Sequence, residues 1–381
     1  MKIKKIPLNI NKSSWTEEQH SLSRQLWTKV IVNSKETYVI LFNAMNGHEI
    51  LEGLGDHTEP FGLEFPSLLD IGVMGHCQNG CENCYQGRKK EPHMSFDDFK
   101  VVIKQSAPYI TQCALGGRGD PNDHPDFERM VAFCRKNNIA PTFTTSGFRL
   151  TDEQITTAKK YCPSVAVSDY GQPETYSALN RLMKANVKTS IQLVLDKLSF
   201  PKAVDMLHGK DVWDGKIDLD KLFGVTFLLY KPQGCGRNKP EKLWRLNNNE
   251  FKIFAEAMKH QDLRKFVAGM DPCLGKHVIT QYGELSSFEK ITFDFCCAGR
   301  KSCYITPDLR LVPCSIGDHV NHGITLKPGK HLRRTMKDVW ANSEPFNLFR
   351  KILRENNYCC PLEVLGEIQK HDEIPSIRSY E

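Results

Sequence analysis

The sequence lacks the features that would place the chain in a membrane or in a secretory pathway. No apolar run approaches the roughly 18 residues that indicate a membrane-spanning helix. Residues 1–11, MKIKKIPLNIN, are basic but contain neither the apolar segment nor the cleavage site of a signal peptide. Internal repeats and low-complexity tracts are also absent from the sequence. We therefore expect a cytoplasmic globular protein with no membrane partner.

Strong charge of one sign is likewise missing. The 381 residues carry a net charge of +6, and 40% of them are apolar. Such a mild positive charge does not by itself indicate a nucleic-acid partner, so we expect none. The apolar fraction is sufficient for a sizeable core, and the length suggests two domains, or one α/β barrel with an addition.

Cysteine, by contrast, is abundant, with 14 residues in the chain. So many thiols indicate either a secreted disulfide framework or the binding of metals or clusters. Disulfide-rich secreted domains are much shorter than this chain, and the sequence has no secretory signal. Metal binding or catalysis is therefore the favoured use of the thiols.

The order of apolar segments predicts an α/β fold with a partial six-stranded (β/α)6 barrel of the TIM type. Before it, residues 1–66 should form a lead-in with a short helix from the capping box at 16–19 and a β-hairpin over 30–42. Six buried strands then alternate with amphipathic helices, which is typical of a parallel sheet covered by helices. The predicted strands are Leu68–Met74, Cys113–Gly116, Thr142–Thr145, Val165–Ser168, Thr189–Leu195 and Val225–Tyr230.

We place the partial barrel in residues 67–235 and a small cysteine-rich domain, with its linker, in residues 236–381. In this second part, helices are expected over Glu250–Val267 and from Glu344 to about Arg354. Five cations and one glutamate mark residues 231–245 as a basic loop that can receive an acidic segment of a partner.

The sharpest motif is Cys77-x3-Cys81-x2-Cys84, directly after the first barrel strand. Loops at the carboxyl ends of parallel strands converge and build active sites. Three thiolates on one short loop can hold three irons of a [4Fe–4S] cluster and leave the fourth iron free for a substrate or cofactor. A closed zinc site is the alternative, but no fourth Cys or His stands at the usual spacing.

This loop resembles the signature of the radical S-adenosylmethionine (SAM) superfamily. The resemblance implies that the open iron binds SAM. One electron, from a donor such as flavodoxin or ferredoxin, then cleaves SAM to methionine and a 5′-deoxyadenosyl radical, which abstracts a hydrogen atom from the substrate. Residues 116–121 (GGRGDP) are similar to the family's Gly-Gly-Glu-Pro segment, with Asp120 in place of glutamate. The SAM-binding residues carried over are Tyr85, Gly116, Gly117, Gly119, Asp120, Thr145, Ser146, Ser168 and Gln192.

A second group of cysteines resembles the auxiliary-cluster domains of the twitch and SPASM type. Cys297-x5-Cys303-x10-Cys314 frames a strand–turn–strand segment in which Leu309 stands where the family's turn carries glycine. The resemblance implies one auxiliary [4Fe–4S] cluster, because the cysteines of a second one are incomplete. Its ligands would be Cys297, Cys303, Cys314 and Cys359, with Cys360, Cys296 and Cys273 as alternates. A zinc site is the alternative use of the same thiols.

Cys235 lies just past the last barrel strand, on the side of the predicted active site. A thiol there can give a hydrogen atom to a substrate radical, which makes Cys235 a candidate catalytic residue. A loop thiol without a role is the alternative. Three further cysteines have apolar neighbours and are expected to pack in the core, namely Cys113, Cys134 and Cys162.

The resemblance fixes a reaction class but leaves several substrates open. Our first hypothesis is an oxidoreductase or maturase that modifies a peptide by crosslinking, epimerisation or oxidation. The second is a dehydrogenase or mutase that acts on a small-molecule metabolite. A non-catalytic iron–sulfur sensor, the third, would need no SAM pocket, and residues 116–121 therefore speak against it.

Overall fold

The computed structural model describes residues 29–368, except for 36, 44–47, 55–59, 239–245, 283–294, 318–320 and 327–334. The helix expected at residues 16–19 and part of the basic loop lie outside these ranges. The strands are β1 Lys29–Val32, β2 Tyr38–Asn43, β3 His48–Gly53, β4 Leu68–Gly75, β5 Gln112–Arg118, β6 Ala140–Thr145, β7 Val165–Ser168, β8 Thr189–Leu195, β9 Gly224–Leu229, β10 Val267–Met270, β11 Ser302–Ile305, β12 Arg310–Val312 and β13 Ile324–Thr325.

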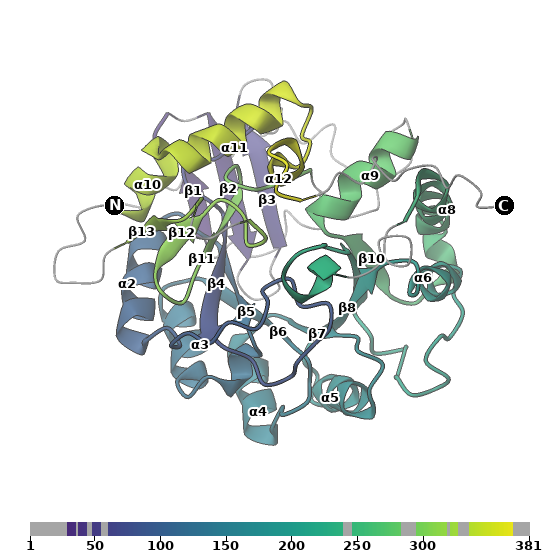
Figure 1. Cartoon of the computed structure of the whole chain (residues 1–381). Helices are drawn as coiled ribbons and strands as arrows, with labels where there is room; N and C mark the ends of the chain where they lie inside the picture. The colour runs from purple at the N-terminus through teal and green to yellow at the C-terminus, as the bar shows by residue number, and fades with distance from the viewer. Residues whose placement is uncertain are drawn as a thin grey trace.

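The helices lie mainly outside the curved sheet (Figure 1). They are α2 Phe96–Ser106, α3 Phe127–Lys136, α4 Asp152–Tyr161, α5 Pro173–Lys184, α6 Phe200–Leu207, α8 Asn248–Lys259, α9 Pro272–Tyr282, α10 Met336–Asn342, α11 Glu344–Glu355 and α12 Pro361–Val364, with 3-10 turns η2 Pro121–Asp123, η3 Gly234–Asn238 and η4 Gln261–Leu263. Within the described residues, no helix is long and apolar enough to cross a membrane.

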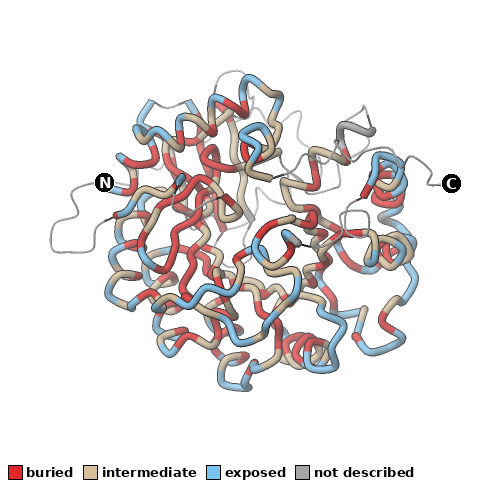
Figure 2. The backbone as a smooth tube through the Cα atoms, viewed as in Figure 1, coloured by how far each residue is buried: buried red, intermediate tan, exposed pale blue. Residues whose placement is uncertain are grey.

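The predicted partial barrel is confirmed. Strands β4 to β9 are the six expected strands, and each pairs in parallel with the next. Their alternating burial explains the arrangement: every second residue, such as Leu69 and Ile71 in β4, is fully buried against the helices. The residues between them face the interior of the barrel. Figure 2 shows that the buried residues are concentrated in these strands and on the inner sides of the helices.

The sheet contains more strands than expected, with additional strands at both of its edges. At one edge, β10 pairs in parallel with β9. The helix that we expected over Glu250–Val267 is shorter, because α8 ends at Lys259 and Val267 is already the first residue of β10. Arg264 then donates to the carbonyl groups of Met258 and His260 at 2.9 and 3.1 Å, which satisfies the free end of the helix. The chain can therefore turn back and enter the sheet as a strand.

At the other edge, the C-terminal hairpin continues the same sheet. β11 pairs in parallel with β4, and β12 and β13 follow in antiparallel order. The expected strand–turn–strand segment is thus present, and α11 matches the expected C-terminal helix to within one residue. Because β11 is part of the barrel sheet, the cysteine-rich domain is fixed against the barrel.

The expected N-terminal hairpin is β1 and β2, and β3 adds a third antiparallel strand. Lys29 of β1 donates from Nζ to the carbonyl oxygens of Ala107 and Ile110, at the C-terminal end of α2. The positive charge thus meets the negative end of a helix, a favourable arrangement. This contact holds the small sheet against the barrel.

At the hairpin turn before β12, the stability gained from side-chain burial can be compared with the cost of backbone strain. Leu309 has a φ of 61°, a left-handed conformation that favours glycine, yet its side chain is only 4% exposed. Leu309→Gly relieves about 1 kcal/mol of strain but loses about 3 kcal/mol of burial. We expect a net loss of about 2 kcal/mol in the free energy of unfolding, measured by urea denaturation.

Asn138 provides the matched control, because it has a φ of 57° but an exposed side chain. Asn138→Gly should change stability by less than about 0.5 kcal/mol. A Leu309→Gly protein as stable as the parent would show that strain, not burial, dominates at this turn.

Candidate functional site

The cysteine loop leaves the carboxyl end of β4 and lies directly against the end of β5. Cys77 is exposed, and Cys81 and Cys84 are half-buried. A Cβ atom on Gly119 would lie 2.7 Å from the carbonyl oxygen of His76, and Gly119 has a φ of 104°. Only glycine fits such a close approach with this backbone conformation. The glycine-rich segment therefore brings the end of β5 to the cysteine loop.

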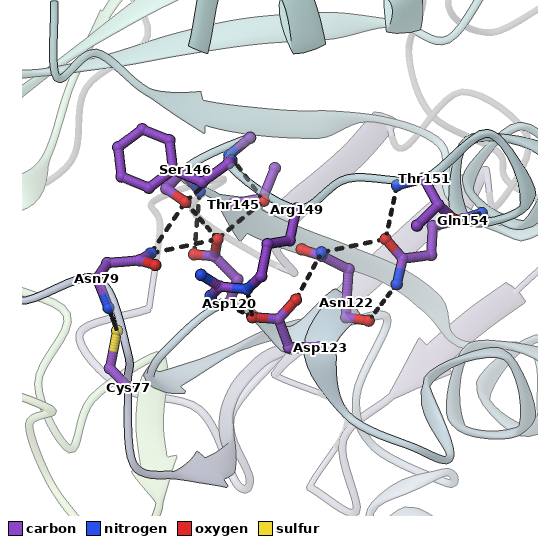
Figure 3. Close-up of polar contacts among 12 residues, drawn as sticks. Cys77, Asn79, Asp120, Asn122, Asp123, Thr145, Ser146, Arg149, Thr151 and Gln154 are labelled. Atoms are coloured by element: carbon purple, nitrogen blue, oxygen red, sulfur yellow. Dashed lines mark hydrogen bonds and ion pairs between the residues drawn. The ribbon is translucent and has the colours of Figure 1, made fainter. Parts of the chain in front are cut away.

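Hydrogen bonds centred on Asp120 tie this loop to two neighbouring strands (Figure 3). The carboxylate accepts from the backbone nitrogen of Ser146 at 3.0 Å, from the Ser146 hydroxyl and from Thr145 Oγ1 at 3.3 Å. Asn79, between the first two cysteines, donates to Ser146 Oγ at 3.0 Å and reaches Asp120 at 3.5 Å. The ends of β5 and β6 and the cysteine loop are thus one connected unit.

Burial dominates the electrostatics of this unit. It raises the pKa of Asp120 despite the lowering effect of the Ser146 hydrogen bonds. It also raises the pKa of Cys81, which neighbours Cys77, and of Cys84, which neighbours Cys81 and Cys235. The three loop thiols are therefore close to one another, and the Cys81 and Cys84 thiols hold their protons more tightly than a free cysteine does.

The residues present suit a cluster better than a single ion. Among the described residues, no three His, Cys, Asp or Glu side chains converge tightly enough to hold one metal ion. A [4Fe–4S] cube instead takes each thiolate on a different iron. In the same loop, Asn79 Oδ1 and Asn83 Oδ1 are buried and find no hydrogen-bond partner in the described part of the chain. They are free to accept a hydrogen bond from a bound group.

The other expected SAM-binding residues fall on the same side of the barrel. Gly116 faces open space, since an added Cβ would meet no atom within 4 Å. Gly117 instead approaches Gly72 on the neighbouring strand, where a Cβ would lie 2.8 Å from its Cα. Ser168 and Gln192 are paired in register on β7 and β8, and both belong to the inward face. The structure therefore brings these residues to one end of one interior surface.

Three residues at this site were not predicted from the sequence. Tyr170 is within hydrogen-bonding reach of the Cys81 thiol and of Ser168. Asn79 holds the cysteine loop, and its place inside the motif was the only signal for it. Lys231, expected in a surface loop, has its side chain enclosed at the end of β9.

A cavity of about 340 Å³ lies between the end of β9, the start of α9 and the segment that leads into α12. Five cysteines line it, which makes it the second candidate metal centre: Cys273, Cys296, Cys314, Cys359 and Cys360. Burial raises the pKa of the Cys273, Cys314 and Cys360 thiols to about 12. Burial also raises the pKa of Cys296, with a further increase from Cys360, Cys273 and Cys314. These four thiols are therefore close neighbours.

The expected ligand set differs from this arrangement at three positions. Cys303 is only 2% exposed and lies on the core face of β11, near Asp70 and Arg350 rather than another thiol. The Cys297 thiol is 3.2 Å from the carbonyl oxygen of Phe295 and does not line the cavity. Cys359 lines it, but its thiol contacts the Lys276 ammonium. Of the expected set only Cys314 belongs to the group of four, and three alternates complete it.

Lys231 lies between the two sulfur-rich sites. Its ammonium pairs with Asp271 and donates to the Leu229 carbonyl oxygen at 3.0 Å. Burial lowers the pKa of Lys231, but Asp271 and Cys273 outweigh this effect and the net shift is upward. Tyr85, just after the third loop cysteine, is near enough to contribute to the same shift. Lys231 therefore links the surroundings of both sites.

Cys235 also lies beside the cysteine loop. Its backbone nitrogen donates to the Cys84 carbonyl oxygen at 2.8 Å, and its thiol is half-buried. A Cβ on Gly234 would lie 2.4 Å from the same carbonyl oxygen, so η3 packs closely on the loop. Of the remaining cysteines, Cys113, Cys134 and Cys162 are buried in the core as expected.

Two family models match this chain. Residues 71–196 match the radical SAM superfamily, and residues 296–361 match the SPASM iron–sulfur cluster-binding domain. The first match begins in β4 and ends just after β8. The second begins at Cys296 and ends just after Cys360, so it includes three of the four neighbouring thiols.

The fold resembles solved structures of low sequence identity. Streptococcus suis SuiB bound to S-adenosylmethionine is 14% identical, with a TM-score of 0.66 over 86% of this chain and 91% of that chain. SuiB bound to the precursor peptide SuiA is 13% identical, with a TM-score of 0.61 over 84% and 90%. The enzyme anSMEcpe with bound AdoMet and the Cp18Cys peptide is 13% identical, with a TM-score of 0.53 over 82% and 91%.

One curated relative matches a shorter stretch. The tungsten-containing aldehyde ferredoxin oxidoreductase cofactor-modifying protein of Pyrococcus furiosus is 30% identical over 91 residues. The match covers 23% of this chain and 26% of that protein's length. It therefore spans about a quarter of each protein.

Proposed function

Since the chain belongs to the radical SAM superfamily and carries a SPASM iron–sulfur domain, we propose that it modifies a peptide by radical chemistry. One observation carries this proposal: the hydrogen bonds of Asp120 connect the three-cysteine loop with the ends of β5 and β6. When bound, the cluster and SAM supply a 5′-deoxyadenosyl radical for hydrogen abstraction.

In this proposal, Cys77, Cys81 and Cys84 hold the SAM-binding cluster. Asp120 is a positioning residue, because its carboxylate is already occupied by Ser146 and Thr145 and keeps Asn79 in place. The expected direct contact between Asp120 and SAM thus becomes an indirect role. SAM would lie along the inward face past Gly116, where Ser168 and Gln192 present polar side chains.

We further propose that Cys273, Cys296, Cys314 and Cys360 hold one auxiliary [4Fe–4S] cluster. Four thiols around one cavity satisfy the ligand count of such a cluster. Cys303 packs in the core, Cys359 contacts Lys276, and Cys297 points to a carbonyl oxygen, so these three remain outside the set.

Two solved relatives with this fold support a peptide substrate, because they contain a bound peptide: SuiB with SuiA, and anSMEcpe with Cp18Cys. The small-molecule hypothesis draws support from the Pyrococcus furiosus protein, which is named for modifying a cofactor. A change of mass in a candidate precursor peptide after incubation with enzyme, SAM and reductant would favour the peptide. Unchanged peptides alongside turnover of a metabolite would favour the alternative.

The first prediction concerns the SAM-binding loop. Cys77→Ala should abolish formation of 5′-deoxyadenosine from SAM with dithionite, because one iron of the cluster loses its ligand. Formation is measured by chromatography after anaerobic reconstitution. Cys134→Ala is the control, since Cys134 is fully buried in the core and should alter stability but not the cleavage. Cleavage that survives in Cys77→Ala would refute the proposed function.

The second prediction concerns the auxiliary ligands. Cys296→Ala should lower the iron content from about eight to about four atoms per chain, while Cys297→Ala, at the adjacent position, should leave it near eight. Iron analysis and Mössbauer spectroscopy measure the two values. The opposite result, loss of iron in Cys297→Ala alone, would restore the ligand set expected from spacing.

The third prediction concerns Cys235. We propose that its S–H bond breaks as it gives a hydrogen atom to the substrate radical, and that one electron from the external donor and one proton return the resulting thiyl radical to the thiol. If so, product formed in D2O should contain one deuterium, and Cys235→Ala should form 5′-deoxyadenosine at the parent rate but no deuterated product. Mass spectrometry of the product measures the incorporation. Deuterated product from Cys235→Ala would exclude this role.

A further inference from the structure

The interior of the barrel contains a carboxylate that the proposed chemistry does not use. Asp70 stands on β4 between Leu69 and Ile71, which are fully buried on the opposite, helix-covered face. The register of the sheet places it in one row with Tyr304 of β11, Ala114 of β5 and, through Ala114, Thr142 of β6. Residues in register on parallel strands share a face, so Asp70 projects into the barrel interior.

The Asp70 side chain makes no hydrogen bond or ion pair in the described part of the chain, although its backbone is paired with both neighbouring strands. Its titratable neighbours are Tyr85, Tyr304 and Cys303, all of them neutral at physiological pH. Two cations lie near the tyrosine neighbours of Asp70, Lys231 near Tyr85 and Arg118 near Tyr304, and both are occupied. Lys231 pairs with Asp271, and Arg118 pairs with Glu91. The carboxylate is therefore uncompensated.

Asp70 is half-buried, so its charged form is less well solvated than at the surface and has no partner in the described part of the chain. Burial raises the pKa of Asp70 to about 7, since its charged form loses solvation without gaining a partner. A neutral hydroxyl group could accept or donate one hydrogen bond, but only a cation would also compensate the charge. The environment therefore favours a positively charged ligand.

The position of Asp70 is suited to contact with a substrate. Tyr85, which follows the cysteine loop, lies close to both Asp70 and Lys231. The small side chain of Ala114 stands beside Asp70, and Gly116, two residues further along β5, faces open space. The carboxylate thus lies on the inner surface between the cysteine loop and the C-terminal hairpin, with room next to it.

We infer that Asp70 determines specificity by binding a cationic group of the substrate, such as the ammonium of a lysine side chain, inside the barrel. This inference rests on the proposed function, which supplies the need for a substrate at this position. The ion pair would hold the substrate next to the site of hydrogen abstraction. Asp70 would act by positioning and takes no part in the cleavage of SAM.

The test uses the reconstituted, SAM-loaded full chain and three probes of matched shape. They are the N-acetyl methylamides of lysine, 6-hydroxynorleucine and norleucine, with a cationic, a neutral polar and an apolar end group. Saturation-transfer NMR titrations give the Kd of each. We expect the lysine probe to bind about tenfold more tightly than either neutral probe, and Asp70→Asn to remove this preference.

Asp152→Asn is the control, because Asp152 is exposed at the start of α4 and forms an ion pair with Arg181 on the surface. It should keep the preference. Equal binding of the three probes by the parent, or an unchanged preference in Asp70→Asn, would overturn the inference. Iron content and 5′-deoxyadenosine formation without substrate report on the proposed function separately, and both should be unchanged in Asp70→Asn.

Discussion

The Asp120 carboxylate is the constraint on which the candidate active site depends. A single buried group accepts hydrogen bonds from the end of β6 and from the cysteine loop, and it belongs to the glycine-rich end of β5. A cysteine loop outside helices and strands lacks the regular backbone hydrogen bonds that would keep it in one conformation. Here the loop is held by a network in which both Asp120 oxygens and the Ser146 hydroxyl oxygen accept hydrogen bonds, so displacement of Ser146 would leave the buried Asp120 carboxylate without its main donors. The position of the thiols is thus set by the ends of the strands.

The pairing of β11 with β4 has a comparable role for the cysteine-rich domain. Parallel pairing fixes the register between Ser302–Ile305 and Leu68–Ile71, and a shift by one residue would exchange the two faces of β11. Cys303 would then enter the barrel and Tyr304 would enter the core. The observed register instead places Tyr304 over Gly72, where an added Cβ would lie 2.2 Å from its hydroxyl. The glycine makes room for the ring, and the ring closes one side of the interior.

The sequence predicts the six central strands well, and it marks the cysteine loop as a candidate site, because both signals are local. Buried strands such as Thr189–Leu195 are short, β-branched and bounded by turns, and Cys77, Cys81 and Cys84 occupy a single loop. The cavity lined by Cys273, Cys296, Cys314 and Cys360 is harder to predict, because these cysteines come from four separated segments of the chain. The spacing of the cysteines led us to expect Cys297 and Cys303 as ligands. The alternation of side chains along the strand SCYI shows only that Cys303 and Tyr304 lie on opposite faces. Which face meets the core depends on pairing with β4, and no local pattern shows that.

The Lys231–Asp271 ion pair explains how the two sulfur-rich sites keep a fixed relation. Asp271 also accepts from the backbone nitrogen of Leu229 at 3.2 Å and from that of Leu274 at 2.8 Å. It therefore connects the end of β9 with the first turn of α9, which carries Cys273. An enclosed ion pair contributes little net stability, because desolvation offsets the attraction between the charges. Its geometry is nevertheless specific, since displacing either partner would leave an uncompensated charge. The same end of β9 continues into η3, whose Cys235 backbone nitrogen donates to the Cys84 carbonyl oxygen, so both sites are anchored to the end of one strand.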